Sequence, residues 1–125
     1  MAKPPYARGK RKERGKMNST EEKFLAEILE PQVAEGRVVQ WWYEKWTWAL
    51  TEATPKGRPG IRYTPDFVAL LDDGLLIVFE VKGTGNARRQ DLNRAKLFAD
   101  LFPLRIFLAT QRAVKNGGGF LIEEL

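Results

Sequence analysis

The stretch that decides the fold is YTPDFVALLDDGLLIVFEVKG, residues 63–83. Two apolar segments flank the turn residues Asp72-Asp73-Gly74, a pattern that predicts a β-hairpin with strands over 61–71 and 75–82. The run LLIVFEV, residues 75–81, is apolar at nearly every position, whereas a strand with one wet face alternates. The second strand is therefore predicted to be the central strand of a sheet.

Charged residues lie opposite one another on the two strands of this predicted hairpin. Pairing through the turn sets Asp66, near the end of its strand, across from Glu80 to Lys82. Because side chains alternate along a strand, Glu80 and Lys82 point to one face, and Val81 points into the core. Ionised carboxylates on such apolar strands are costly unless a cation compensates for them. The pattern predicts a metal site.

The composition limits the chemistry that this site can use. The chain has no Cys and no His, which excludes zinc fingers, thiol nucleophiles and histidine-based catalysis. Mg²⁺, with Mn²⁺ as its expected substitute, prefers oxygen ligands, and Asp66, Glu80 and the backbone carbonyl of Val81 make a sufficient set. Lys82 would orient or deprotonate the attacking water and offset charge on the transition state. We therefore expect Mg²⁺-dependent phosphodiester hydrolysis.

The segments YTPDF (63–67) and FEVKG (79–83) resemble the two half-motifs of the PD-(D/E)XK nuclease superfamily. The resemblance covers about residues 18–112. Within the superfamily, the chain resembles in particular the phage Holliday-junction-resolvase-like endonucleases. It implies an α/β (α+β) class with a restriction-endonuclease-like core, in which helices flank a mixed central sheet in the order αβββαβ. It also implies a metal-dependent endodeoxyribonuclease that acts on branched DNA in recombination. Cutting opposed strands of a junction calls for two active sites, so a homodimer is expected.

The rest of the chain fits this order of elements. A capping-box pattern at 18–22 starts a helix that Pro31 and Gly36 bound. The further predicted elements are two strands or one bent strand over 38–50, a loop over 53–60, a helix over 86–102, a strand over 104–110, a turn over 116–119 and a short edge strand over 120–124.

The resolvase pattern also carries an acid on the first helix, for which Glu21 and Glu22 are the candidates. At 100° per residue, Glu21 falls on the apolar stripe of residues 24–29, and Glu22 falls beside it. We expect Glu21 to face the sheet as a catalytic residue that reaches the metal or its water. The alternative for both acids is that they cap the helix and complement its dipole.

The positive charge is concentrated in one segment. Of the net +5, residues 1–17 contribute +6, which leaves the remaining 108 residues at −1. With its Pro and Gly and little to bury, this segment is predicted to be a disordered basic arm in front of a nuclease domain at 18–125. Lys10, Arg11 and Lys12 would contact DNA phosphates there, although a solubilising tail also fits.

Two further groups are candidates for contact with DNA. Arg89, Asn93 and Lys96 form one polar stripe on the predicted helix, where a plain solvated face is the alternative. The four tryptophans could stack on bases, pack a dimer or fill the core; they are Trp41, Trp42, Trp46 and Trp48.

The rival to a nuclease is a catalytically inactive nucleic-acid-binding module of the same fold. No run of about 20 apolar residues suggests a membrane span, so no membrane partner is expected. We expect a cytoplasmic protein, located in the host cytoplasm if it is encoded by a phage.

Overall fold

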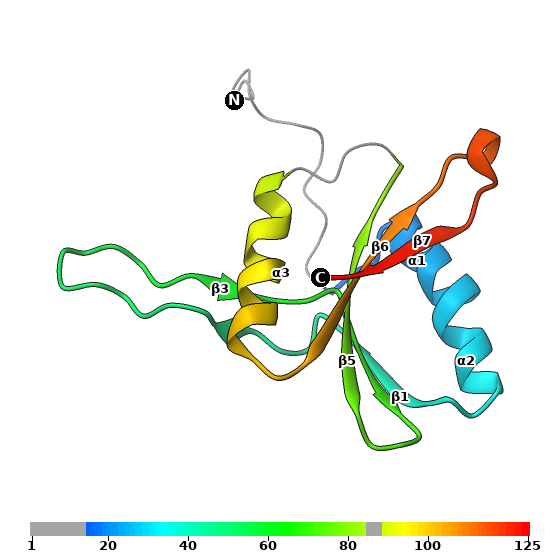
Figure 1. Cartoon of the computed structure of the whole chain (residues 1–125), viewed down its shortest axis with the longest axis horizontal. Helices are drawn as coiled ribbons and strands as arrows, with labels where there is room; N and C mark the ends of the chain where they lie inside the picture. The colour runs from blue at the N-terminus through cyan, green and yellow to red at the C-terminus, as the bar shows by residue number, and fades with distance from the viewer. Residues whose placement is uncertain (1–14, 85–88) are drawn as a thin grey trace.

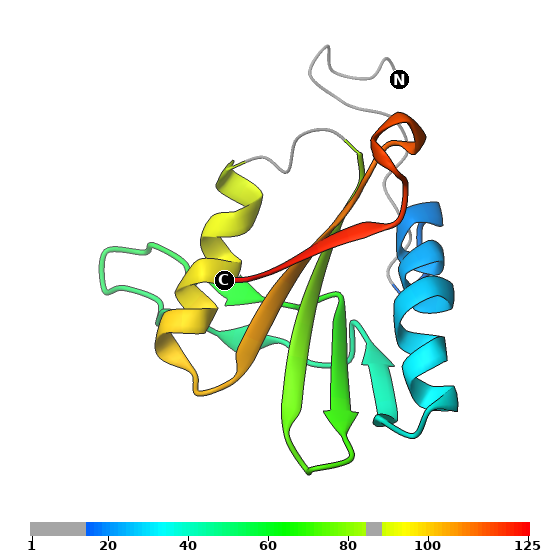
Figure 2. The ribbon, with the colours of Figure 1, turned by 45° about the vertical axis from the view of Figure 1, so that its right-hand side comes forward.

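The computed structural model describes residues 15–84 and 89–125, and the side chains of all of these except 89–91. It is a mixed α+β structure in which helices lie on both faces of a five-stranded sheet (Figures 1 and 2). The elements are α1 (Ser19–Phe24), the π-helical turn η1 (Leu25–Leu29), α2 (Glu30–Ala34), β1 (Val38–Tyr43), β2 (Trp48–Ala49), β3 (Arg62–Tyr63), β4 (Phe67–Leu71), β5 (Leu76–Lys82), α3 (Arg89–Leu101), β6 (Arg105–Gln111), the 3-10 turn η2 (Val114–Asn116) and β7 (Phe120–Glu124).

The large sheet has the strand order β1-β4-β5-β6-β7, and β2 and β3 pair separately. β5 and β6 are parallel, because α3 crosses over between them, and the other neighbours are antiparallel. The predicted hairpin is β4–β5, and β5 is the central strand as expected. Val78 is completely buried, in keeping with a strand that helices cover on both faces.

The predicted strand over 61–71 is wrong in its extent. Residues 64–66 separate β3 from β4, and the two strands belong to different sheets. Pro65 lacks the N–H that a continuous ladder would need at this point. Of the two alternatives for 38–50, two strands or one bent strand, the structure has two strands, and they are also split between the sheets, with β1 on β4 and β2 on β3.

The first helix starts with the predicted capping box. The Glu21 N–H donates to Asn18 Oδ1 at 2.8 Å, and the Asn18 N–H donates to Glu21 Oε1 at 3.0 Å. Pro31, however, does not end the helix. It lies in the first turn of α2, directly after the π-helical turn, where a missing N–H is tolerated. The helix ends before Gly36, whose φ of 81° is left-handed.

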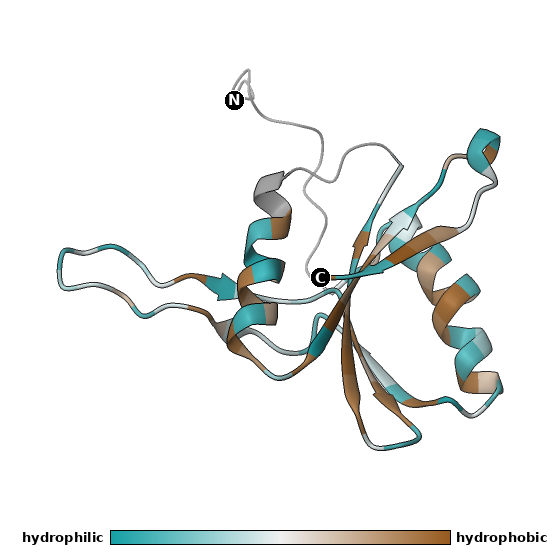
Figure 3. Ribbon diagram, viewed as in Figure 1, coloured by the Kyte–Doolittle hydropathy of each residue, from teal (hydrophilic) through white to brown (hydrophobic). Residues whose placement is uncertain are grey.

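Two apolar clusters hold the layers together, one on each face of the sheet. Phe24 and Leu29 of the first helix pack on Phe67 and Phe79, and α3 packs Ala95 and Phe98 on the opposite face. Figure 3 shows hydrophobic residues concentrated along the central strands. At about 25 cal/mol per Å² of buried apolar surface, these clusters supply most of the favourable free energy of folding.

The tryptophans mainly pack within the protein. Trp41, Trp42 and Trp48 are half-buried, and the Trp48 ring lies 5.1 Å from that of Phe98 in α3. Trp46 is 37% exposed and lies 4.9 Å from Trp42, measured between ring centroids. Packing is therefore the role that the structure assigns to most of this group.

Part of the predicted basic arm touches the folded body. Met17 packs against the apolar cluster beneath the first helix, and the Gly15 N–H donates to Glu44 Oε2 at 3.2 Å. Residues 1–14 lie outside the described residues. Across 15–84 and 89–125, no helix is both long and apolar enough to cross a lipid bilayer.

Candidate metal and catalytic site

Three carboxylates follow one another across three neighbouring strands. Tyr43 pairs with Phe67, and Phe67 pairs with Phe79, so the next position on each strand holds Glu44, Asp66 or Glu80. The Glu44 N–H donates to the Asp66 carbonyl at 3.0 Å, and the Val81 N–H donates to Asp66 Oδ2 at 2.8 Å. Asp66 therefore lies in the middle of the row, where the β4–β5 ladder ends.

Glu80 has two partners on the face of the sheet that α3 covers. The Tyr63 hydroxyl donates to Glu80 Oε1 at 3.0 Å, and Lys82 Nζ lies 3.5 Å from Glu80 Oε2. This ion pair confirms that Glu80 and Lys82 share a face, and Val81 is buried in the opposite apolar cluster, as predicted. Glu80 is 7% exposed, so its charge depends on these partners.

Glu21 approaches Asp66 from the other face. It is 2% exposed, whereas Glu22 is exposed, as the helical angles predict. The Tyr43 hydroxyl lies 2.9 Å from Glu21 Oε1 and 3.1 Å from the Lys16 carbonyl, and its single proton serves one of them at a time. The Thr20 hydroxyl lies 3.3 Å from Gln111 Oε1 of β6, which fastens the start of α1 over the end of the sheet. Glu21 thus caps its helix and also faces the site.

One carboxylate oxygen from each of Glu21, Glu44 and Asp66 lies within 4.8 Å of the other two. Oxygen donors of this kind suit Mg²⁺, Mn²⁺ or Ca²⁺. This set differs from the predicted ligands Asp66, Glu80 and Val81, and Asp66 is common to both. The chemistry of the donors therefore fits a hard divalent cation.

Glu44 was not among the candidate residues predicted from the sequence. Its φ of 45° makes it the one non-glycine residue with a positive φ in the described chain, and this turn of the backbone ends β1 beside Asp66. In the sequence it is one acid after a strand, a pattern too common to be informative. Only the pairing of β1 with β4 brings it to the site.

Burial and mutual repulsion determine the ionisation of these acids. The pKa of Asp66 is raised to about 8, chiefly by burial and then by the charge of Glu80, while the hydrogen bond from Val81 opposes the rise. Burial also raises the pKa of Glu80, against the opposing effects of Lys82 and Tyr63. The pKa of the Tyr63 hydroxyl is raised by burial and by the Glu80 charge. A bound cation would relieve this repulsion.

Of the predicted DNA-binding residues, the structure describes the side chains of Asn93 and Lys96 alone. Asn93 and Lys96 are exposed on α3 and, among the described residues, form no hydrogen bond or ion pair with the site. The side chain of Arg89 lies outside what the structure describes. So do three residues of the predicted arm, Lys10, Arg11 and Lys12.

Comparison with protein-family models, with curated proteins and with solved structures found no match to this chain.

Proposed function

We propose that this chain is a metal-dependent DNA endonuclease of the PD-(D/E)XK type, and that it cleaves branched DNA. The observation that carries the proposal is the meeting of Asp66, Glu80 and Lys82 at the end of the β4–β5 hairpin, with Asp66 hydrogen-bonded to Val81 and Lys82 paired with Glu80. The order of the elements also supports a restriction-endonuclease-like core. The first helix precedes β1, β4 and β5, and α3 connects β5 to the parallel strand β6.

In this proposal Mg²⁺ or Mn²⁺ is held by Asp66 with Glu80 and the Val81 carbonyl. When bound, it supplies Lewis-acid stabilisation of the phosphate and activates water. Glu21 and Glu44 carry the carboxylates on the other side of Asp66 and can bind or orient waters of the ion. Lys82 orients the attacking water and offsets the charge that develops on the phosphate.

The buried acids themselves argue against a purely structural reading. Glu21 and Glu80 are both more than nine-tenths buried and flank Asp66, so three carboxyl groups meet where folding alone would favour apolar residues. A nucleic-acid-binding module without catalysis has no use for acids that face phosphate. This favours the nuclease over the inactive module.

The test is cleavage of a labelled four-way junction and of a matched linear duplex, each with Mg²⁺, with Mn²⁺ and with EDTA. The proposal expects junction cleavage with either ion and none with EDTA or with Asp66→Asn. Binding to both DNAs without cleavage under any ion would identify the inactive module instead. A strict monomer, on and off DNA, in sedimentation would contradict symmetric resolution by a homodimer.

A further inference from the structure

A narrow β-ribbon projects from the body next to the candidate site. It comprises residues 45–62, hereafter the ribbon, and its chain leaves the sheet after Glu44 and returns before Asp66. Figures 1 and 2 show it extending outward past α3, well beyond the other elements. Both of its ends therefore lie at the carboxylates.

The ribbon is braced along its length. Backbone N–H groups of Leu50 and Thr51 donate to the Ile61 carbonyl at 2.7 and 3.3 Å, and the Ile61 N–H donates to Thr51 Oγ1 at 2.9 Å. A Cβ at Gly60 would clash with the Thr51 carbonyl oxygen. Only glycine therefore allows the two sides of the ribbon to approach each other this closely.

The tip is a closed turn. The Gly57 N–H donates to the Thr54 carbonyl at 3.0 Å, and the Thr54 N–H donates to the Arg58 carbonyl at 2.8 Å. The Arg58 N–H donates in return to Thr54 Oγ1 at 3.1 Å. The side chains at the tip are therefore presented on an ordered backbone, which lowers the entropy lost on binding.

The root of the ribbon is fixed to α3 and to the site. The rings of Trp48 and Tyr63 lie 5.1 and 5.4 Å from Phe98, and the Tyr63 hydroxyl holds Glu80. Beside this root, Ile61 shares a shallow hollow with Asn93 and Arg94 of α3. The ribbon and the polar face of α3 thus form one continuous surface.

Basic side chains are concentrated on the ribbon. It carries four exposed basic side chains against the single acid Glu52, while the remainder of residues 18–125 is net −4. Among the described residues, none of the four is within ion-pair distance of a carboxylate; they are Lys45, Lys56, Arg58 and Arg62. Figure 3 shows this extension to be largely hydrophilic. Unpaired cations on a projecting element are suited to an anionic partner.

We propose that the ribbon binds the phosphate backbone of duplex DNA that flanks the cleaved bond. This rests on the proposed function, because it is the proposed cleavage at the base of the ribbon that makes DNA the substrate. Each of the two sides of the ribbon has about nine residues. At roughly 3.3 Å per residue, the ribbon reaches at most ~30 Å from the body, close to the length of one turn of B-DNA. Lys and Arg that contact phosphates position the protein without selecting a sequence.

The test uses the full chain and measures binding to a labelled duplex in EDTA, where no turnover occurs, as a function of salt. Lys56→Gln with Arg58→Gln removes the two cations of the tip. Each lost phosphate contact is expected to flatten the log–log salt slope by about 0.9, so the double variant should lose about 1.8 in slope and on the order of tenfold in affinity at 0.1 M salt. Its melting temperature should not change.

The matched control is Arg37→Gln with Arg105→Gln, which removes the same charge at the opposite end of the strands. The proposal expects the control to bind as the wild type does. Wild-type affinity and slope in the tip variant, or an equal loss in the control, would overturn the role of the ribbon while leaving the nuclease proposal intact. A wild-type chain that neither binds nor cleaves DNA would overturn both.

Discussion

Asp66 is the central residue of the candidate site. It accepts the Val81 N–H on one side, lies beside Glu21 and Glu44 on the other, and experiences the charge of Glu80. Its carboxylate is thus shared between the two possible sets of ligands. Substitutions here are therefore expected to change both metal binding and the pH dependence of stability.

The first prediction concerns the acid pair. Asp66→Asn or Glu80→Gln should reduce cleavage to background and leave DNA binding equal or tighter, because each change removes a metal ligand and relieves repulsion of phosphate. Calorimetry should show weaker binding of Mg²⁺ or Mn²⁺. Undiminished turnover by Asp66→Asn would remove this residue from the site.

The second prediction is a pH dependence of stability. The pKa of Asp66 in the folded protein, about 8, lies above its ordinary value of 3.8, so between these pH values the folded state binds more protons than the unfolded state. Without metal, the free energy of unfolding should therefore fall as the pH rises from 4 to 8. Asp66→Asn abolishes this titration and should be more stable than the wild type at pH 8 in EDTA, by up to about 5 kcal/mol.

Urea unfolding at pH 4 and pH 8 checks this second prediction. The difference between the two proteins should be small near pH 4, where the folded wild-type carboxyl is protonated and the unfolded one is only about half ionised, and it should vanish at lower pH. Mg²⁺ at pH 8 should stabilise the wild type more than the variant. Identical pH profiles for the two proteins would contradict the raised pKa.

The third prediction compares two adjacent acids. Glu21→Gln retains a hydrogen-bonding group for Asn18 and Tyr43 but loses the charge beside Asp66, so it should lower the cleavage rate with little change in melting temperature. Glu22→Gln, on the exposed side of the same turn, is the control and should leave activity unchanged. Equal kinetics for Glu21→Gln and wild type would leave this residue with its capping role alone.

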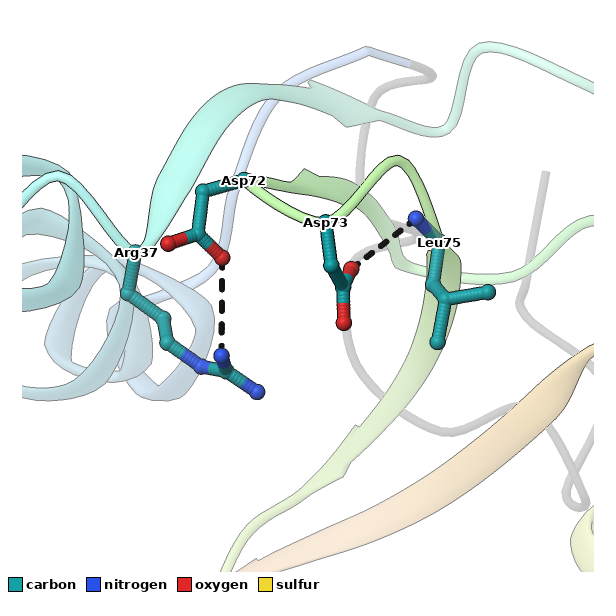
Figure 4. Close-up of polar contacts among 4 residues, drawn as sticks. All are labelled: Arg37, Asp72, Asp73 and Leu75. Atoms are coloured by element: carbon teal, nitrogen blue, oxygen red, sulfur yellow. Dashed lines mark hydrogen bonds and ion pairs between the residues drawn. The ribbon is translucent and has the colours of Figure 1, made fainter.

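At the scale of elements, the tight turn between β4 and β5 is what aligns the two half-motifs. Asp73 Oδ1 accepts the Leu75 N–H at 3.1 Å, and Arg37 lies 3.4 Å from Asp72 Oδ1, as Figure 4 shows. The ion pair is more than half exposed on both sides and contributes little. Gly74 closes the turn with a φ of 87°.

The fourth prediction tests that turn. Gly74→Ala meets no atom within 4 Å but must adopt a left-handed backbone, so it should lower the free energy of unfolding by about 1 kcal/mol. Gly83→Ala is the control, because its Cβ makes only an ordinary contact of 3.5 Å with Thr20. Denaturant unfolding of both variants measures the difference. An equal loss in both would show that the backbone at Gly74 is not the cause.

At the scale of the molecule, the charge is divided between the basic arm, the ribbon and an otherwise acidic body. The fifth prediction is that deleting residues 2–14 weakens binding to junction and duplex by similar factors. Removing six basic residues should flatten the salt slope by up to about 5. Gly15 and Lys16 are retained because both contact residues of the site. Loss of junction binding alone would instead make the arm the part that recognises the branch.

Much of the site could be derived from the sequence, because its central part is local. A short turn fixes the register of its hairpin, and the alternation of side chains then places Asp66, Glu80 and Lys82 together. The helical period likewise distinguished Glu21 from Glu22. These relations hold within a few residues of each other or across one tight turn.

What only the tertiary structure decided is the part that depends on contacts distant in sequence. Pairing of β1 with β4 brings Glu44 beside Asp66, and the separation of β3 from β4 lets Tyr63 reach Glu80. The same separation turns residues 45–62 into a projecting ribbon rather than part of the main sheet. The β-strand propensity of these residues is the same whether they join the main sheet or form the ribbon. The choice between them is made by burial against the two helical layers, which no short stretch of sequence contains.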